Sequence, residues 1–236
     1  PGQIDSIPCG AMAPLAEVRS LQRTFLVPFA SIPCWPQVDP DRLAGSHRLD
    51  VFCRSLAAAL GQRPRKDSSF LAAFAKPSWT RRIGMGLLES LDGQPPAGAA
   101  PIGVVEVVGG KSQDVFLEER PTAQRLKHLL QQQTVPGWRC WEEASMRSLL
   151  LKLLKDLQVG GQSVRLFVLQ EEAAETAEEA LAQLAVQPKV QVDHVIFVIG
   201  DHIGLRPMAF GRLVNDFGAK AISLPTAPLL TSQCIT

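Results

Sequence analysis

The order of apolar and polar residues predicts strands that alternate with helices. Short apolar runs, the usual mark of strands, occur at 23–30, 69–75, 102–108, 164–169, 195–199 and 219–224. Apolar residues at helical spacing predict helices within 45–60 and 142–158. Further helices are expected at 120–133, where Pro121 suits a first turn, at the Ala- and Glu-rich segment 171–185, and at 207–217 before Gly218, and 138–141 indicates a further extended segment. The run 195–199 is wholly apolar, as expected for a strand covered by helices on both faces. The pattern therefore predicts an α/β fold with a mostly parallel sheet.

Two segments interrupt this alternation. Residues 1–20 are rich in Pro, Gly and other small residues, which predicts a flexible N-terminal arm. Residues 76–101 contain repeated Gly and Pro, which predicts an inserted loop with room for a short helix at 83–91. We therefore expect one domain over 21–236, with an insertion at 76–101.

Composition narrows the class of protein. The chain has 236 residues, of which 46% are hydrophobic and 20% charged, values typical of a soluble globular protein. No apolar run reaches the roughly 18 residues of a transmembrane helix, and the first ten residues lack a secretory signal. The five cysteines are scattered and odd in number, without metal-ligand spacing. We therefore expect no metal site and an intracellular, cytoplasmic protein, with a nuclear or organellar location left open.

Charge alone does not identify a partner. The net charge is +1, whereas nucleic-acid-binding domains are often far more basic. The sequence also lacks the glycine-rich motif of Rossmann folds, the P-loop, the H-E-x-x-H zinc motif and the G-x-S-x-G serine motif. Those classes of enzyme are disfavoured.

The most informative stretch follows the apolar run 195–199, which leads directly into Gly200-Asp201-His202-Ile203-Gly204. In open α/β sheets, ligands bind beyond the carboxyl ends of the strands. Gly200 lets a ligand approach the backbone closely, because it has no side chain. An ordinary turn is the alternative interpretation of this segment.

Four ordered blocks resemble one known family. They read AGSHRLDVFCRSLAAAL at 44–60, LEERPTAQRLKHLL at 117–130, FVIGDHIGL at 197–205 and AKAISLPTAPLLTSQCIT at 219–236. Together they resemble the TrmY-type tRNA pseudouridine N1-methyltransferases of the SPOUT class. The resemblance covers most of 23–236, and four blocks in order are more specific than any one of them.

The resemblance implies a SPOUT-type parallel sheet with a C-terminal trefoil knot, in a homodimer. It also implies that S-adenosyl-L-methionine binds among three loops near 169–171, 199–205 and 223–235. The cofactor-binding residues implied in this way are Leu169, Ile199, Gly200, Asp201, His202, Gly204, Ser223, Leu224, Leu229 and Cys234. The implied reaction is methylation of N1 of a pseudouridine in the T loop of tRNA.

Methylation at N1 requires a proton to leave that nitrogen, so a carboxylate near the base would assist. We expect Asp50 to orient or deprotonate the base, and Arg48 and Arg54 to contact RNA. The alternatives are a first-turn carboxylate favoured by the helix dipole and ordinary surface arginines. Cys53 lies on the apolar side of the same predicted helix, which favours a place in the core over a reactive thiol.

Some positions in the last block leave alternatives open. Asp201 is suited to ribose hydroxyls or to loop amides, and His202 to a ligand or to a turn. Pro225 stands where the family has Gly, and Gln233 where it has His. A SPOUT-fold protein that binds RNA or a partner without methyl transfer is therefore an alternative function. A SPOUT enzyme with another acceptor, such as rRNA, is a second alternative.

Overall fold

The computed structural model describes residues 21–33, 36–45, 47–61, 65–75, 101–112, 118–186, 192–201, 205 and 207–224. The predicted arm at 1–20 and almost all of the predicted insertion at 76–101, including its short helix, lie outside these residues. The segment 225–236, which the predicted knot requires, also lies outside them.

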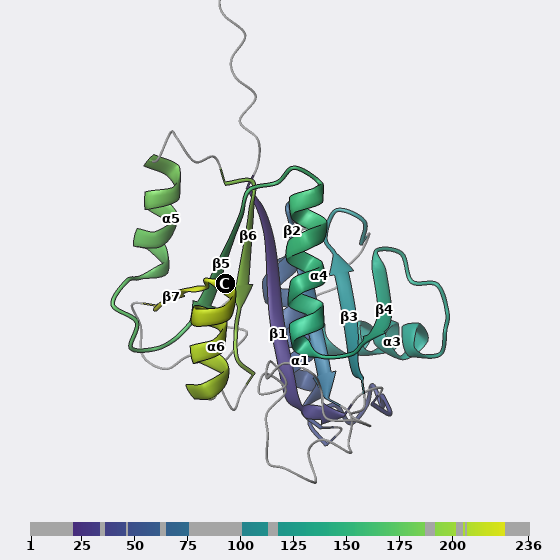
Figure 1. Cartoon of the computed structure of the whole chain (residues 1–236). Coiled ribbons are helices and arrows are strands. Elements are labelled where there is room, and N and C mark those ends of the chain that lie inside the picture. Colours follow the sequence, from purple (N-terminus) through teal and green to yellow (C-terminus); the bar gives the residue numbers. More distant parts are fainter. Residues whose placement is uncertain are drawn as a thin grey trace, which may run out of the picture.

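The described residues form an α/β fold, as predicted (Figure 1). Its elements are β1 (Gln22–Pro33), α1 (Leu49–Leu60), β2 (Ser68–Ala75), β3 (Ile102–Val108), α3 (Glu119–Leu130), β4 (Trp138–Glu143), α4 (Met146–Val159), β5 (Val164–Leu169), α5 (Ala177–Val186), β6 (His194–Val198), α6 (Pro207–Phe217) and β7 (Lys220–Ile222). The seven strands form one sheet in the order β4-β3-β2-β1-β6-β5-β7. The pairs β1–β2, β1–β6, β5–β6 and β5–β7 are parallel, and β2–β3 and β3–β4 are antiparallel. The sheet is therefore mostly parallel.

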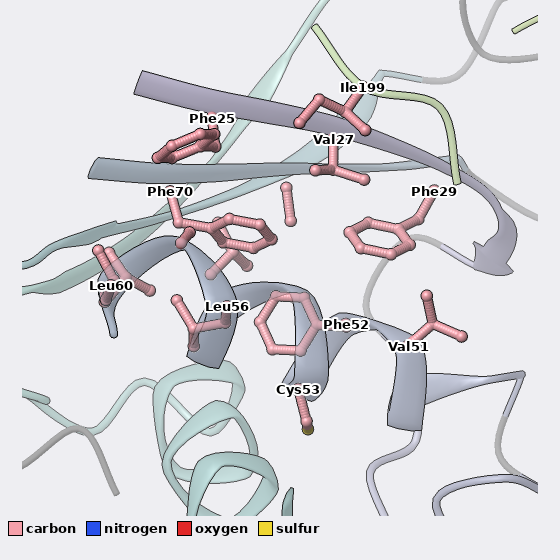
Figure 2. Close-up of a cluster of buried hydrophobic side chains, with 14 of the residues drawn as sticks. Phe25, Val27, Phe29, Val51, Phe52, Cys53, Leu56, Leu60, Phe70 and Ile199 are labelled. Carbon is pink, nitrogen blue, oxygen red and sulfur yellow. The ribbon is translucent and has the colours of Figure 1, made fainter. Parts of the chain in front are cut away.

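Both faces of the sheet are covered by helices. Alternate residues of β1 face opposite sides, so that Phe25, Val27 and Phe29 join one cluster and Leu26 joins the other. Helices α1, α3 and α5 contribute to the first cluster, and α4 and α6 to the second. Phenylalanines dominate the first cluster, where α1 lies against β1 and β2 (Figure 2). Burial on both faces explains why the central strands are almost continuously apolar.

The predicted start of the α4 helix was wrong. The sequence suggested a helix from Glu142, but Glu142 and Glu143 belong to β4 and the helix begins at Met146. Ser145 is the N-cap, and its side chain accepts a hydrogen bond from the backbone N–H of Ser148 at 3.1 Å. This cap fixes the start of the helix four residues later than the acidic pair suggested.

The predicted start of α5 was also too early, at residue 171 instead of Ala177. Thr176 and Glu179 form a reciprocal capping box. The Thr176 hydroxyl accepts from the Glu179 N–H at 3.2 Å, and the Glu179 carboxylate accepts from the Thr176 N–H at 2.9 Å. Residues 171–176 therefore form a loop between β5 and α5.

Over the residues that the structure describes, no helix has both the length and the apolar character needed to span a membrane.

Candidate functional site

Three of the predicted ligand segments meet at one edge of the sheet. In the parallel register, Leu169 at the end of β5 lies beside Ile222 of β7, and Val168 lies beside Val198 of β6. Ile199 and Ser223 directly follow β6 and β7. The carboxyl ends of the three strands are therefore neighbours, which is where open α/β sheets bind ligands.

Backbone hydrogen bonds hold this edge together. The Ser223 N–H donates to the Glu175 carbonyl at 2.8 Å, and the Ala177 N–H donates to the Ser223 carbonyl at 2.8 Å. The Ile199 N–H donates to the Leu26 carbonyl at 3.0 Å, which ties the end of β6 to β1. The loop between β5 and α5 is thus attached to the residue that follows β7. A ligand at this edge would meet backbone that is already fixed.

The predicted cofactor residues at the edge are mostly shielded from solvent. Ile199, Asp201 and Ser223 are buried, whereas Leu169 and Gly200 are half-buried. Leu224 is half-buried as well. A buried carboxylate next to a residue without a side chain suits a polar, flat ligand. The other four predicted residues of this set, His202, Gly204, Leu229 and Cys234, lie outside the described residues.

The predicted catalytic and RNA-binding residues form a second cluster at the start of α1. Arg48 donates from Nε to Oδ1 of Asp50 at 3.0 Å, and from its terminal nitrogen to Oδ2 at 3.2 Å. Arg54 pairs with Oδ2 of Asp50 and lies 3.4 Å from a carboxylate oxygen of Glu119. The order of charges is therefore Arg48, Asp50, Arg54, Glu119. We call these four residues the α1 cluster.

The α1 cluster determines the protonation of Asp50. Burial by itself raises the pKa of Asp50, but the hydrogen bonds and charge of Arg48, together with those of Arg54, outweigh it and lower the pKa. Asp50 is therefore ionised at neutral pH, and both of its oxygens already accept hydrogen bonds. Such a carboxylate is a weak base, and it holds the side chains of both arginines in position.

The backbone entering α1 adopts an uncommon conformation. His47 and Arg48 have φ angles of 55° and 63°, in the left-handed region that non-glycine residues rarely occupy. Arg48 is the N-cap of α1 and makes no side-chain cap. Its guanidinium bonds to Asp50 instead. Strained residues of this kind often mark functional sites, and here the strain accompanies the Arg48–Asp50 contact.

The α1 cluster lies at the same edge of the sheet as the three strand ends. Phe52, near the start of α1, packs on Phe29 and Phe74 at the carboxyl ends of β1 and β2. Leu60, at the other end of the helix, lies toward Phe25 at the start of β1 (Figure 2). Helix α1 thus begins at the carboxyl edge, and β1 separates β2 from β6 within the sheet.

Cys53 lies in the core, as predicted. It is only 1% exposed, and burial raises the pKa of its thiol to about 12. A thiol with this pKa carries almost no thiolate at neutral pH and is a poor nucleophile. Cys53 therefore contributes packing to the α1 face.

Sequence analysis did not identify Glu119 or Glu175. Glu119 falls in one of the four blocks, but its contact with Arg54 joins α1 to α3 across a long sequence separation. Glu175 accepts from Ser223 through its backbone carbonyl, which carries no residue-type signal, and its side chain pairs with Lys220 of β7, far away in the sequence. In the described part of the chain, no group of three or more His, Cys, Asp or Glu side chains is placed to hold a metal ion.

Comparison of the sequence with protein-family models gives no match, and comparison with curated proteins gives no significant match.

Proposed function

We propose that the protein is an S-adenosyl-L-methionine-dependent RNA methyltransferase of the SPOUT class, acting on N1 of a pseudouridine in the T loop of tRNA. The observation that carries the proposal is the meeting of Leu169, Ile199 and Ser223 at one carboxyl edge of a mostly parallel sheet. These segments are distant in sequence, yet the resemblance to the TrmY family assigns all three to one cofactor site.

The residues at this edge fit such a cofactor. Gly200, which has no side chain, is half-buried between the buried residues Ile199 and Asp201. Asp201 offers a carboxylate for ribose hydroxyls. When bound, the cofactor supplies an already activated methyl group, so the protein has mainly to align the acceptor nitrogen with it.

Asp50 acts on the acceptor base. Methylation of N1 would make the N1 proton acidic, so that this proton must leave. A weak base is sufficient for a proton of that acidity. We therefore assign Asp50 to accept the N1–H hydrogen bond and to orient the base, with the proton passing on to solvent.

Arg48 and Arg54 contact the RNA backbone in this proposal. Their side chains are 45% and 39% exposed, so both retain surface that faces solvent while bonded to Asp50. Exposed arginines of this kind suit phosphate oxygens. The expected C-terminal knot and homodimer belong to the same proposal, and light scattering at micromolar concentration should give twice the chain mass.

Cofactor binding tests the site directly. Titration calorimetry of the protein with S-adenosyl-L-methionine should give saturable heat, and Gly200→Val should weaken binding by more than about tenfold. Gly211→Val is the matched control, because a Cβ at Gly211 of α6 meets nothing within 4 Å. Equal affinity of the folded Gly200→Val variant and the control would contradict the placement.

An RNA-binding protein without methyl transfer is the second candidate. Pro225 favours it, because Pro has a fixed φ and no N–H donor at a position where the family has Gly. RNA binding by the protein with no heat on cofactor titration would identify this second function.

A further inference from the structure

A charged surface with an aromatic side chain lies on the opposite face of the sheet from the α1 cluster. Trp141 of β4 is half-buried and lies close to two cations. The Arg139 guanidinium is 5.0 Å from the centre of the Trp141 ring, and the Lys152 ammonium of α4 is 5.7 Å from it. We call Arg139, Trp141 and Lys152 the β4 surface.

The cations of the β4 surface are exposed, whereas the anions that hold them are buried. The side chains of Arg139 and Lys152 are 70% and 55% exposed. Their partners Glu106 and Glu143 are only 9% and 11% exposed. The carboxylates therefore lie beneath the cations, and the surface presented to solvent is positive although the local net charge is close to zero.

The contacts beneath the surface fix the positions of the cations. Glu143 accepts hydrogen bonds from Trp141 Nε1 at 3.1 Å, from the Ser148 hydroxyl at 2.9 Å and from Lys152 at 2.9 Å. Arg139 donates its Nε–H to Glu106, and within the described chain nothing accepts from its terminal nitrogens. The outer edge of the guanidinium is thus available to an incoming acceptor.

Among the described helices, α4 reaches this part of the sheet through Ser148 and Lys152, which contact Glu143 of β4. Helix α3 contributes to the first core cluster on the other face of the sheet, and the axis of α4 lies in front of the central strands (Figure 1). Glu143 pairs with Ile102, and Gly103 pairs with Phe74 near the end of β2. The end of β4 therefore lies at the same edge of the sheet as the α1 cluster.

We propose that the β4 surface is a second RNA-binding surface, which contacts the phosphate backbone outside the modified loop. The inference rests on the proposed function in that it takes RNA as the partner. Charge complementarity carries it, because exposed, pre-positioned cations suit a polyanion. Neighbouring strands are about 4.8 Å apart, so β4 lies roughly 14 Å from β1. An RNA stem joined to the modified loop is long enough to reach the β4 surface while the loop lies at the α1 cluster.

The test is RNA affinity measured by fluorescence anisotropy over a range of salt concentrations, with a T-arm stem-loop as the probe. Arg139→Gln with Lys152→Gln should lower affinity by about tenfold at low salt. It should also reduce the slope of log affinity against log salt by about 1.5, as expected for two lost phosphate contacts. The charge-preserving pair Arg139→Lys with Lys152→Arg should keep the wild-type slope.

The control is Lys127→Gln with Arg165→Gln, which removes the same charge from exposed positions on α3 and at the start of β5. Equal losses in the control and the test variant would overturn the β4 surface, and so would an unchanged salt slope in a variant that still binds cofactor. Failure of the wild-type protein to bind RNA at all would instead refute the RNA partner itself, and with it both proposals.

Discussion

Replacing Asp50 by Asn tests the α1 cluster most sharply. The Asp50 carboxylate accepts from Arg48 with both oxygens and from Arg54 with one. Asn has nearly the same shape as Asp but only one acceptor oxygen. Its N–H₂ group, a donor, would face a guanidinium that is also a donor. Hydrogen bonds to charged groups contribute about 1.5–3 kcal/mol each, and the partly exposed arginines reduce that to about 1 kcal/mol. We therefore expect Asp50→Asn to destabilise the fold by about 1–2 kcal/mol.

Thermal unfolding at pH 7 measures this loss, which corresponds to a fall in Tm of about 3–6 °C for a chain of this size. The effect also has a predicted pH dependence. Because the folded pKa of Asp50 is lowered, its stabilisation is present above the unfolded pKa of about 3.9 and is lost as the pH falls through the folded pKa. The difference between wild type and variant should therefore shrink below pH 4.

Glu119→Gln is the control within the same cluster. Its carboxylate is 42% exposed and lies 3.4 Å from Arg54, so its loss should cost less than about 0.5 kcal/mol. An unchanged Tm for Asp50→Asn, or a difference from wild type that grows on acidification, would refute the assigned role of Asp50 as the residue that holds the two arginines.

Further predictions concern the core. Gly109→Ala should cost about 2 kcal/mol or more in urea unfolding, since a Cβ there would lie 2.3 Å from the Arg65 carbonyl; an unaffected midpoint would contradict this. Gly211→Ala should instead stabilise by up to about 1 kcal/mol, because α6 has open space there, and a lower Tm would count against that packing. Burial lowers the pKa of His194, so wild-type stability should fall below about pH 6.5; His194→Gln should flatten that slope, and an equal slope would exclude His194 as its source. Cys53 should react with a thiol reagent only on unfolding; rapid labelling of the native protein at Cys53, located by peptide mass spectrometry, would disprove its burial.

The fold class could be predicted from the sequence, because strands that are buried on both faces are almost continuously apolar. Runs such as 102–108 and 164–169 correspond residue for residue to β3 and β5. Helix starts were harder to predict. Glu142 and Glu143 resembled a first-turn acidic pair, yet Glu143 is a strand residue that accepts from Lys152. The capping box at Thr176 and Glu179 was present in the sequence, but the acids at 171 and 172 suggested an earlier start.

The candidate site was predictable only in part. Arg54 lies four residues after Asp50, so their contact can be read from helical spacing. The contact of Arg54 with Glu119 cannot be read in this way, because it depends on how α3 packs against α1. The same holds for Glu175 and Ser223, whose pairing is set by the order of β5 and β7 in the sheet. The strained backbone at His47 and Arg48 carries no sequence signal, because neither residue is a glycine.

The most direct test of the proposed function is single-turnover methyl transfer. The full chain is mixed with labelled S-adenosyl-L-methionine and a T-arm stem-loop that carries either pseudouridine or uridine at the target position. The account predicts that label enters the pseudouridine RNA only, because uridine is linked to ribose through N1 and has no proton there. Labelling of both RNAs to the same extent, or of neither RNA by a protein that binds cofactor and RNA, would contradict it.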